Sequence, residues 1–173
     1  MEIRELCTRS LLGLLAVLVA CGSVSESPLP SGVRGDRLLV EKAAHRMGLF
    51  RGDSLLKVYR VALSRAPVGD KMQEGDNRVP EGVYRIDRRL EHSRFHRALH
   101  VSYPDSAHAT RAHALGLAPG GDVMVHGIKN GLGWVGAWQR RLDWTKGCIA
   151  VTNAEIDELW RAVPDGAIIE IRP

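Results

Sequence analysis

Two segments of the chain carry residue types that can perform nucleophilic chemistry. The apolar run 123–126 delivers His126 at its end, and the run 143–153 places Cys148 directly after a glycine. Thiolate is the reactive form of cysteine, and a neighbouring imidazole can take the thiol proton. The two segments therefore predict Cys148 as a nucleophile and His126 as its base. His126, as an imidazolium beside the sulfur, would also raise the thiolate fraction.

The glycine before the cysteine favours acyl chemistry. A residue without Cβ lets a substrate carbonyl come close to the backbone. The N–H groups of Gly147 and Cys148 are therefore the expected donors to an oxyanion. Composition supports the pair only weakly, because seven histidines give many Cys/His pairs by chance.

The N-terminal segment predicts export and a lipid anchor. Residues 11–20 are uncharged and mostly apolar, and they are too few to cross about 30 Å of hydrocarbon. Such a segment is typical of a secretory signal. The small Ala20 followed by Cys21 resembles a bacterial lipobox, in which the cysteine is lipidated and becomes the new N-terminus. The alternative is an ordinary signal peptide that happens to meet a cysteine.

We therefore expect three parts in the chain. Residues 1–20 form a lipoprotein-type signal peptide, and residues 21–35 carry the lipid on Cys21 and form a flexible tether rich in Ser, Pro and Gly. Residues 36–173 form one catalytic domain. Gly22-Ser23 lacks the aspartate associated with inner-membrane retention, so we expect the periplasmic face of a Gram-negative outer membrane.

This organisation gives Cys148 a special status. Cys7 would leave with the signal and Cys21 would carry lipid, so Cys148 would be the sole free thiol of an exported protein. An unpaired cysteine in an oxidising compartment is a candidate reactive thiol. The alternative is a buried cysteine that packs as a small apolar group, and the count alone does not choose between them.

Composition and patterning set the fold class. With 24 Lys+Arg, 20 Asp+Glu and a net charge of +4, the chain lacks the basic stripe of a nucleic-acid-binding protein. Short strand-like runs separated by turn residues predict a mainly β sandwich or barrel with about two helical caps. Strands are expected at 37–41, 48–51, 54–63, 82–87, 96–103, 122–126 and 167–171, and helices at 106–115 and 153–163.

The motifs resemble the catalytic domain of bacterial L,D-transpeptidases, the YkuD domain. The resemblance covers residues 36–173, includes the segments 68–84 and 102–104, and rests most on His126-Gly127, Thr145, Gly147, Cys148, Ile149 and Asn153. Two positions depart from the family pattern. Lys146 stands where most members have a second histidine, and Ala150 stands where many have an arginine.

The resemblance implies a function and a set of site residues. Acyl transfer on peptidoglycan tetrapeptide stems would proceed through a thioester on Cys148, with the carbonyl of Gly127 orienting the base and no metal or other cofactor. Substrate contacts would come from Thr145, Lys146, Asn153 and Trp144. The acceptor would be the amine of another stem or of a wall-linked protein lysine.

Other functions remain open on the sequence alone. Resolution of the thioester by water would make the protein a hydrolase that cleaves stem-peptide or peptidoglycan–protein links. A non-enzymatic, lipid-anchored wall-binding module is a second alternative, and a thiol redox protein, which lacks a second nearby cysteine, is a third. Trp134 and Trp138 are expected either to line a substrate wall or to pack in the core. His92, His96 and His100, about 13 Å apart at every fourth position of a strand, are not expected to share a metal.

Overall fold

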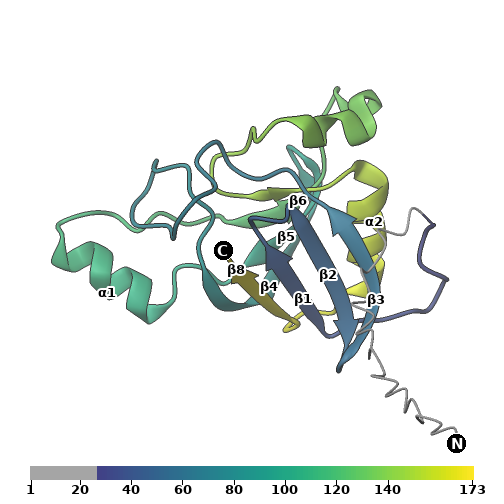
Figure 1. Cartoon of the computed structure of the whole chain (residues 1–173), viewed down its shortest axis with the longest axis horizontal. Coiled ribbons are helices and arrows are strands. Elements are labelled where there is room, and N and C mark those ends of the chain that lie inside the picture. Colours follow the sequence, from purple (N-terminus) through teal and green to yellow (C-terminus); the bar gives the residue numbers. More distant parts are fainter. Residues whose placement is uncertain (1–26) are drawn as a thin grey trace, which may run out of the picture.

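The computed structural model describes residues 27–173, which form a curled eight-stranded sheet with helices around it (Figure 1). In chain order the elements are β1 (Arg37–Glu41), β2 (Arg46–Arg51), β3 (Ser54–Arg60), β4 (Gly82–Ser93), β5 (His96–Val101), α1 (Ser106–Ala114), β6 (Met124–His126), a 3₁₀ segment (Gly133–Arg141), β7 (Ile149–Ala150), α2 (Asn153–Ala162) and β8 (Ile168–Arg172). The predicted fold class, mainly β with helical caps, is confirmed.

The sheet order is β3-β2-β1-β8-β4-β5-β6-β7. The closing strand β8 lies in the middle, parallel to β1 and antiparallel to β4. The long strand β4 joins the two halves, because its first residues pair with β8 and its later residues pair with β5. At the far end β6 and β7 are parallel, with Val125 opposite Ile149 and His126 opposite Ala150. This parallel pair brings two segments that are distant in sequence to one edge of the sheet.

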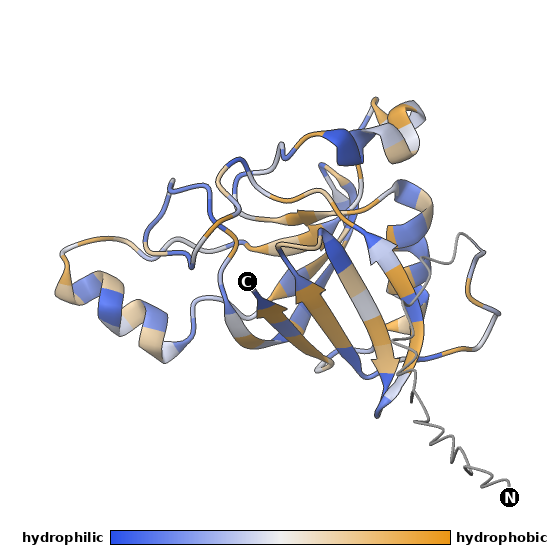
Figure 2. Cartoon of the chain, in the orientation of Figure 1, coloured by the Kyte–Doolittle hydropathy of each residue, from blue (hydrophilic) through white to orange (hydrophobic). Residues whose placement is uncertain are grey.

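The core lies on the inner face of the curled sheet. Apolar residues gather on the strands, and the outer faces of the helices are more polar (Figure 2). Helix α2 covers β5 and β6 and buries Ile156, Leu159 and Ala162. Its start is fixed by a capping box, in which the Thr152 side chain and Glu155 bond to each other's backbone N–H. The helix therefore supports the sheet edge that carries His126.

Several elements differ in extent from the sequence prediction. β4 continues to Ser93 rather than ending at 87, because β5 pairs with its polar second half, where the alternation of apolar and polar residues is lost. β3 ends at Arg60 rather than at 63, and the 3₁₀ segment was not expected. Helix α1 projects away from the sheet, at the left of Figure 1.

The described part of the expected tether lies against the domain. The backbone N–H of Leu29 donates to Glu158 Oε2 at 2.6 Å, and Gly35 N–H donates to the carbonyl of Ala162 at 2.9 Å. Residues 27–35 are therefore held at the C-terminal half of α2. The expected signal peptide at 1–20 and the lipidation site Cys21 lie outside the described residues. Within residues 27–173 the helices are too short or too polar to cross a bilayer.

Candidate active site

The parallel pairing of β6 and β7 brings the predicted nucleophile and base to one sheet edge. His126 is the last residue of β6 and lies opposite Ala150, two residues beyond Cys148. The Cys148 thiol is partly exposed and donates to the carbonyl of Asp122 at 3.6 Å. Within residues 27–173 it makes no hydrogen bond to His126. The sheet thus places the two residues at one edge, and the thiol hydrogen bonds to the Asp122 carbonyl rather than to His126.

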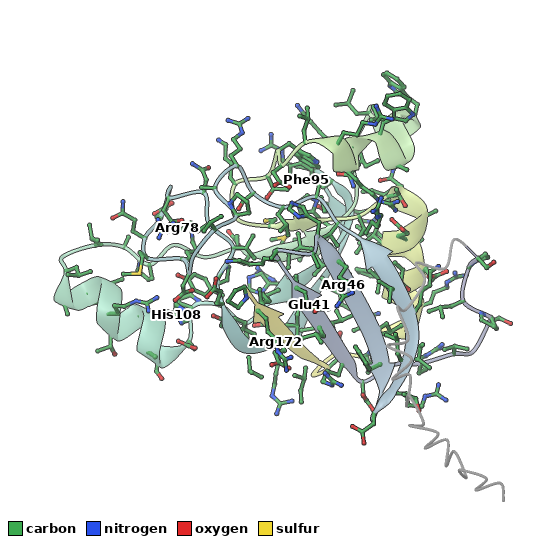
Figure 3. All side chains as sticks on the ribbon, viewed as in Figure 1. Glu41, Arg46, Arg78, Phe95, His108 and Arg172 are labelled. Carbon is green, nitrogen blue, oxygen red and sulfur yellow. The ribbon has the colours of Figure 1, made fainter. Side chains whose placement is uncertain are left out.

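His126 lies in a closed aromatic pocket. Its side chain is 3% exposed, and its ring lies 4.5 Å from the Phe95 ring and 5.7 Å from the Trp144 ring between centroids (Figure 3 labels Phe95). The Nδ1 atom lies 2.7 Å from the carbonyl oxygen of Gly127. A carbonyl can only accept, so Nδ1 carries the proton and Nε2 is left as an acceptor.

Burial decides the charge of both groups. It lowers the pKa of His126 to about 4, although the Gly127 carbonyl acts in the opposite direction. Burial also raises the pKa of the Cys148 thiol, as does the Asp122 carboxylate, whereas a backbone hydrogen bond from Met124 and the charge of Lys71 lower it. At neutral pH the resting pair is therefore a neutral thiol and a neutral imidazole. This differs from the expected imidazolium, because the closed pocket disfavours the charged ring.

Both motif glycines are required by close approach of the backbone. Gly147 has φ +127°, and a Cβ there would lie 3.0 Å from the carbonyl oxygen of Arg78. At Gly127 a Cβ would lie 2.8 Å from Asn153 Oδ1 and 3.0 Å from the carbonyl oxygen of Phe95. A larger residue at either position would displace the loop that carries the nucleophile or the one that orients the base.

The two expected oxyanion donors are not equivalent. The N–H of Gly147 is directed at Thr145 Oγ1, at a long distance of 3.4 Å. The N–H of Cys148 has no acceptor within residues 27–173, so it is the donor left open for a substrate oxygen. Thr145 is buried, and its hydroxyl donates to the carbonyl of Cys148 at 2.7 Å. Thr145 thus shapes the nucleophile turn from inside, rather than facing substrate as expected.

The other expected substrate contacts have different surroundings. Asn153 accepts the N–H of Ile128 at 2.8 Å, so its side chain holds the backbone beyond His126. Trp144 forms one wall of the imidazole pocket and donates from Nε1 to Gln139 at 2.7 Å. Lys146 is exposed and has no bonded partner among the described residues. Of the four, Lys146 is the side chain most open to a ligand.

Trp134 and Trp138 lie on the surface. Trp134 is 84% exposed and Trp138 is 66% exposed, both on the 3₁₀ segment. Core packing, one of the two alternatives for these residues, is therefore excluded. Within residues 27–173 no group of three or more His, Cys, Asp or Glu side chains could hold a metal ion. His96 and His100 instead pair with separate carboxylates, those of Asp157 and Asp87.

Three residues of the site were not singled out from the sequence. Phe95 stacks on the imidazole from the β4–β5 turn, and Asp122 supplies the carbonyl that the thiol contacts. Lys71 lies close to Gly147, with its Nζ atom 3.8 Å from where a Cβ of that glycine would be. The segment 68–84 resembles the family pattern, but nothing in the sequence distinguishes Lys71 within it.

A cavity of about 1260 Å³ lies elsewhere, between β3, α2 and the 3₁₀ segment. Its lining includes both acidic and basic side chains, and several are paired with each other, as in Lys57 with Glu158 and Arg140 with Glu155. Neither Cys148 nor His126 lines it. The chemistry therefore belongs to the open sheet edge, not to this cavity.

Comparison with known proteins agrees with this geometry. The sequence profile of the YkuD family, described as the L,D-transpeptidase catalytic domain, matches residues 35–171. A relative from Escherichia coli K12, curated as "Putative L,D-transpeptidase YafK", is 29% identical over 121 residues, which is 69% of this chain and 41% of that protein. The chain thus spans about two fifths of the length of this curated relative.

Solved structures share the fold. The cell shape determining protein Pgp2 from Campylobacter jejuni has a TM-score of 0.59 at 21% identity, over 79% of this chain and 46% of its own. An L,D-transpeptidase from Xylanimonas cellulosilytica has a TM-score of 0.54 at 14% identity, over 84% of this chain and 64% of its own. Because the family profile matches residues 35–171, a region that includes Cys148 and His126, the chain belongs to the YkuD family of L,D-transpeptidase catalytic domains.

Proposed function

We propose that the protein is a peptidoglycan L,D-transpeptidase that works through a thioester on Cys148. The observation that carries this proposal is the β6–β7 edge, where a partly exposed cysteine and a buried neutral imidazole lie together in a chain of this family. A neutral imidazole with a free Nε2 is suited to act as a general base. An open N–H at Cys148 is suited to receive a carbonyl oxygen that becomes negative during attack.

The reaction follows from these roles. The Cys148 sulfur turns from the Asp122 carbonyl toward His126, passes its proton to Nε2 and attacks the carbonyl carbon of a tetrapeptide stem. A C–S bond forms and the C–N bond to the terminal D-alanine breaks, with the leaving amine taking the proton back from His126. An acceptor amine then attacks the thioester, its proton passing to His126. The new C–N bond forms, the C–S bond breaks, and the sulfur recovers a proton.

The two positions that depart from the family pattern, Lys146 and Ala150, concern the choice of substrate and acceptor. Ala150 is fully buried and cannot contact a substrate carboxylate as an arginine would. Lys146 offers an exposed ammonium beside the nucleophile instead. These differences support an acceptor or donor other than the family's usual one, including water, which would release stem-peptide or protein links rather than join them.

Incubation of the protein with purified sacculi tests the proposal. Mass spectrometry of the muropeptides should show loss of the terminal D-alanine together with either new cross-links or new hydrolysis products. Cys148→Ala, which fits the same space, should give neither product while retaining the wild-type circular dichroism spectrum. Turnover by the alanine variant, or unchanged muropeptides with wild type, would contradict the proposal.

We also propose that the protein is anchored in the periplasm, at the outer membrane, through lipid on Cys21. The sequence Leu18-Val19-Ala20-Cys21 supports this, with Gly22-Ser23 after it. Stable anchoring takes more than one acyl chain, which a multiply acylated cysteine provides. Wild type should fractionate with the outer membrane, and Cys21→Ala should not be retained there. Equal membrane retention of both proteins would remove the lipid assignment.

A further inference from the structure

A buried lysine lies at the nucleophile turn. Lys71 is 4% exposed, and its Nζ atom is 3.8 Å from the position that a Cβ on Gly147 would occupy. The ammonium therefore lies within contact range of the backbone next to Cys148. Burying an ammonium is costly, so a lysine is placed there only with partners that keep it charged.

The ammonium has such partners, but they do not use all of its capacity. Its Nζ atom donates to Asp76 Oδ1 at 2.8 Å and to the carbonyl of Gln73 at 3.1 Å. Within residues 27–173 these are its only acceptors, while an ammonium has three N–H donors. One donor therefore remains for a group outside the chain or for the sulfur.

The segment that carries Lys71 is fixed from several sides. The Asp76 carboxylate also accepts the backbone N–H groups of Met72, Gln73 and Arg78, which closes the turn. Next to Lys71, Asp70 forms an ion pair with Arg111 of α1. His108, on the same helix, is labelled in Figure 3. The charge is thus held in place before any substrate arrives, which is the condition for electrostatic stabilisation.

Two other side chains at the site could carry a positive charge, but neither is suited to stabilise a thiolate. His126 is uncharged at neutral pH, because its pocket lowers its pKa to about 4. Lys146 is exposed, so water screens its charge. Among the described cations, Lys71 combines burial with proximity to the nucleophile turn.

We propose that Lys71 is the cation of this active site, and that its ammonium stabilises the negative charge on the Cys148 sulfur once the thiol proton has left. The inference rests on the proposed function in one respect, that Cys148 is the nucleophile. Lys71 is an electrostatic and positioning residue in this scheme, and His126 remains the group that takes the proton.

Alkylation of Cys148 in the full chain tests this without any substrate. Cysteines 7 and 21 are first replaced by serine, so that one thiol reacts. The rate with neutral iodoacetamide is followed against pH, and the ratio of the rates with anionic iodoacetate and iodoacetamide is measured at a pH above the midpoint. In Lys71→Met the pH midpoint of alkylation should rise by about one unit. This is the lower end of the effect of a nearby opposite charge, because the Asp76 carboxylate already offsets part of the lysine's charge. The rate ratio should fall several-fold.

Matched variants separate charge from structure. Lys42 is also buried, and it bonds the same segment through Gly69, Val79 and Glu81, so Lys42→Met removes a buried charge away from the sulfur. It should leave the midpoint of alkylation unchanged. Lys71→Arg should restore most of the rate ratio.

A further variant keeps the test decisive if Lys71→Met fails to fold. Asp76→Asn keeps an oxygen acceptor but removes the opposing charge, so the midpoint should fall. An unchanged midpoint in a folded Lys71→Met, or no fall in Asp76→Asn, would overturn the assignment. A failure of the proposed function would show instead as unchanged muropeptides with wild type, while the alkylation results still report on Lys71.

Discussion

Acidification should destabilise the fold through protonation of the buried His126. The pKa of His126 is lowered to about 4 from an ordinary value of 6.5. As pH falls below about 6.5 the unfolded chain binds a proton at this site, and the folded chain does not until about pH 4. The free energy of unfolding therefore falls with decreasing pH across this window, and His126 gives no penalty above it.

The size of the effect follows from the shift. One pKa unit corresponds to about 1.4 kcal/mol, so the full window costs about 3 kcal/mol. Between pH 7 and pH 5, where the folded protein still holds the ring neutral, the loss is about 2 kcal/mol. This loss is a large fraction of the 5–15 kcal/mol by which a typical domain is stable. Linear extrapolation of urea unfolding curves is accurate enough to resolve it.

Urea unfolding of the full chain at pH 7 and pH 5 measures the effect. Wild type should lose about 2 kcal/mol more than His126→Gln between the two pH values, since all other titrating groups cancel in the comparison. His113, which is exposed on α1, supplies the control, and His113→Gln should keep the wild-type dependence. Equal losses in wild type and His126→Gln would refute the neutral, buried state of the ring.

Four further outcomes are expected. Alkylation of Cys148 in wild type should follow a single ionisation above the ordinary thiol range, because burial raises its pKa; a reactive plateau below pH 7 would instead reveal an ion pair with His126. His126→Ala should lower turnover on sacculi about a hundredfold, the scale for loss of a general base, and full turnover would remove it from that role. Thr145→Val should cost about 1–3 kcal/mol in urea unfolding, because the Cys148 carbonyl loses its buried donor, and Thr145→Ser should not. Glu158→Gln should cost about 3 kcal/mol by leaving the buried Lys57 ammonium without a counter-charge, which urea unfolding at pH 7 would detect and an unchanged unfolding midpoint would contradict.

Much of the fold could be predicted because local signals were strong. Burial alternates along β1, and the helix expected at 153–163 is observed as α2, whose C-terminal end lies one residue earlier. The second half of β4 could not be found in this way. Its side chains are mostly polar and partly exposed, so only pairing with β5 makes it a strand.

The site was predictable as a set of motifs but not as a geometry. His126 and Cys148 could be named because each follows a recognisable pattern with glycine. The roles of Thr145 and Asn153 could not, since a polar side chain in a motif gives no sign of whether it faces substrate or the backbone beneath. The charge of His126 depends on Phe95, whose contact with the ring exists only once the β4–β5 turn has folded.

The neutral resting pair and the buried cation together explain how a lone thiol can be both stable and reactive. Oxidation proceeds through the thiolate, so a thiol whose pKa is raised by burial is protected in the oxidising compartment that we propose for this protein. The same burial would make attack on a substrate costly if nothing offset the new negative charge. A neutral imidazole accepts the proton only during attack, and an ammonium fixed beside Gly147 is already in place when the charge forms. Under the proposed mechanism the thiol passes its proton to His126 only during attack, so it stays protonated in the free protein.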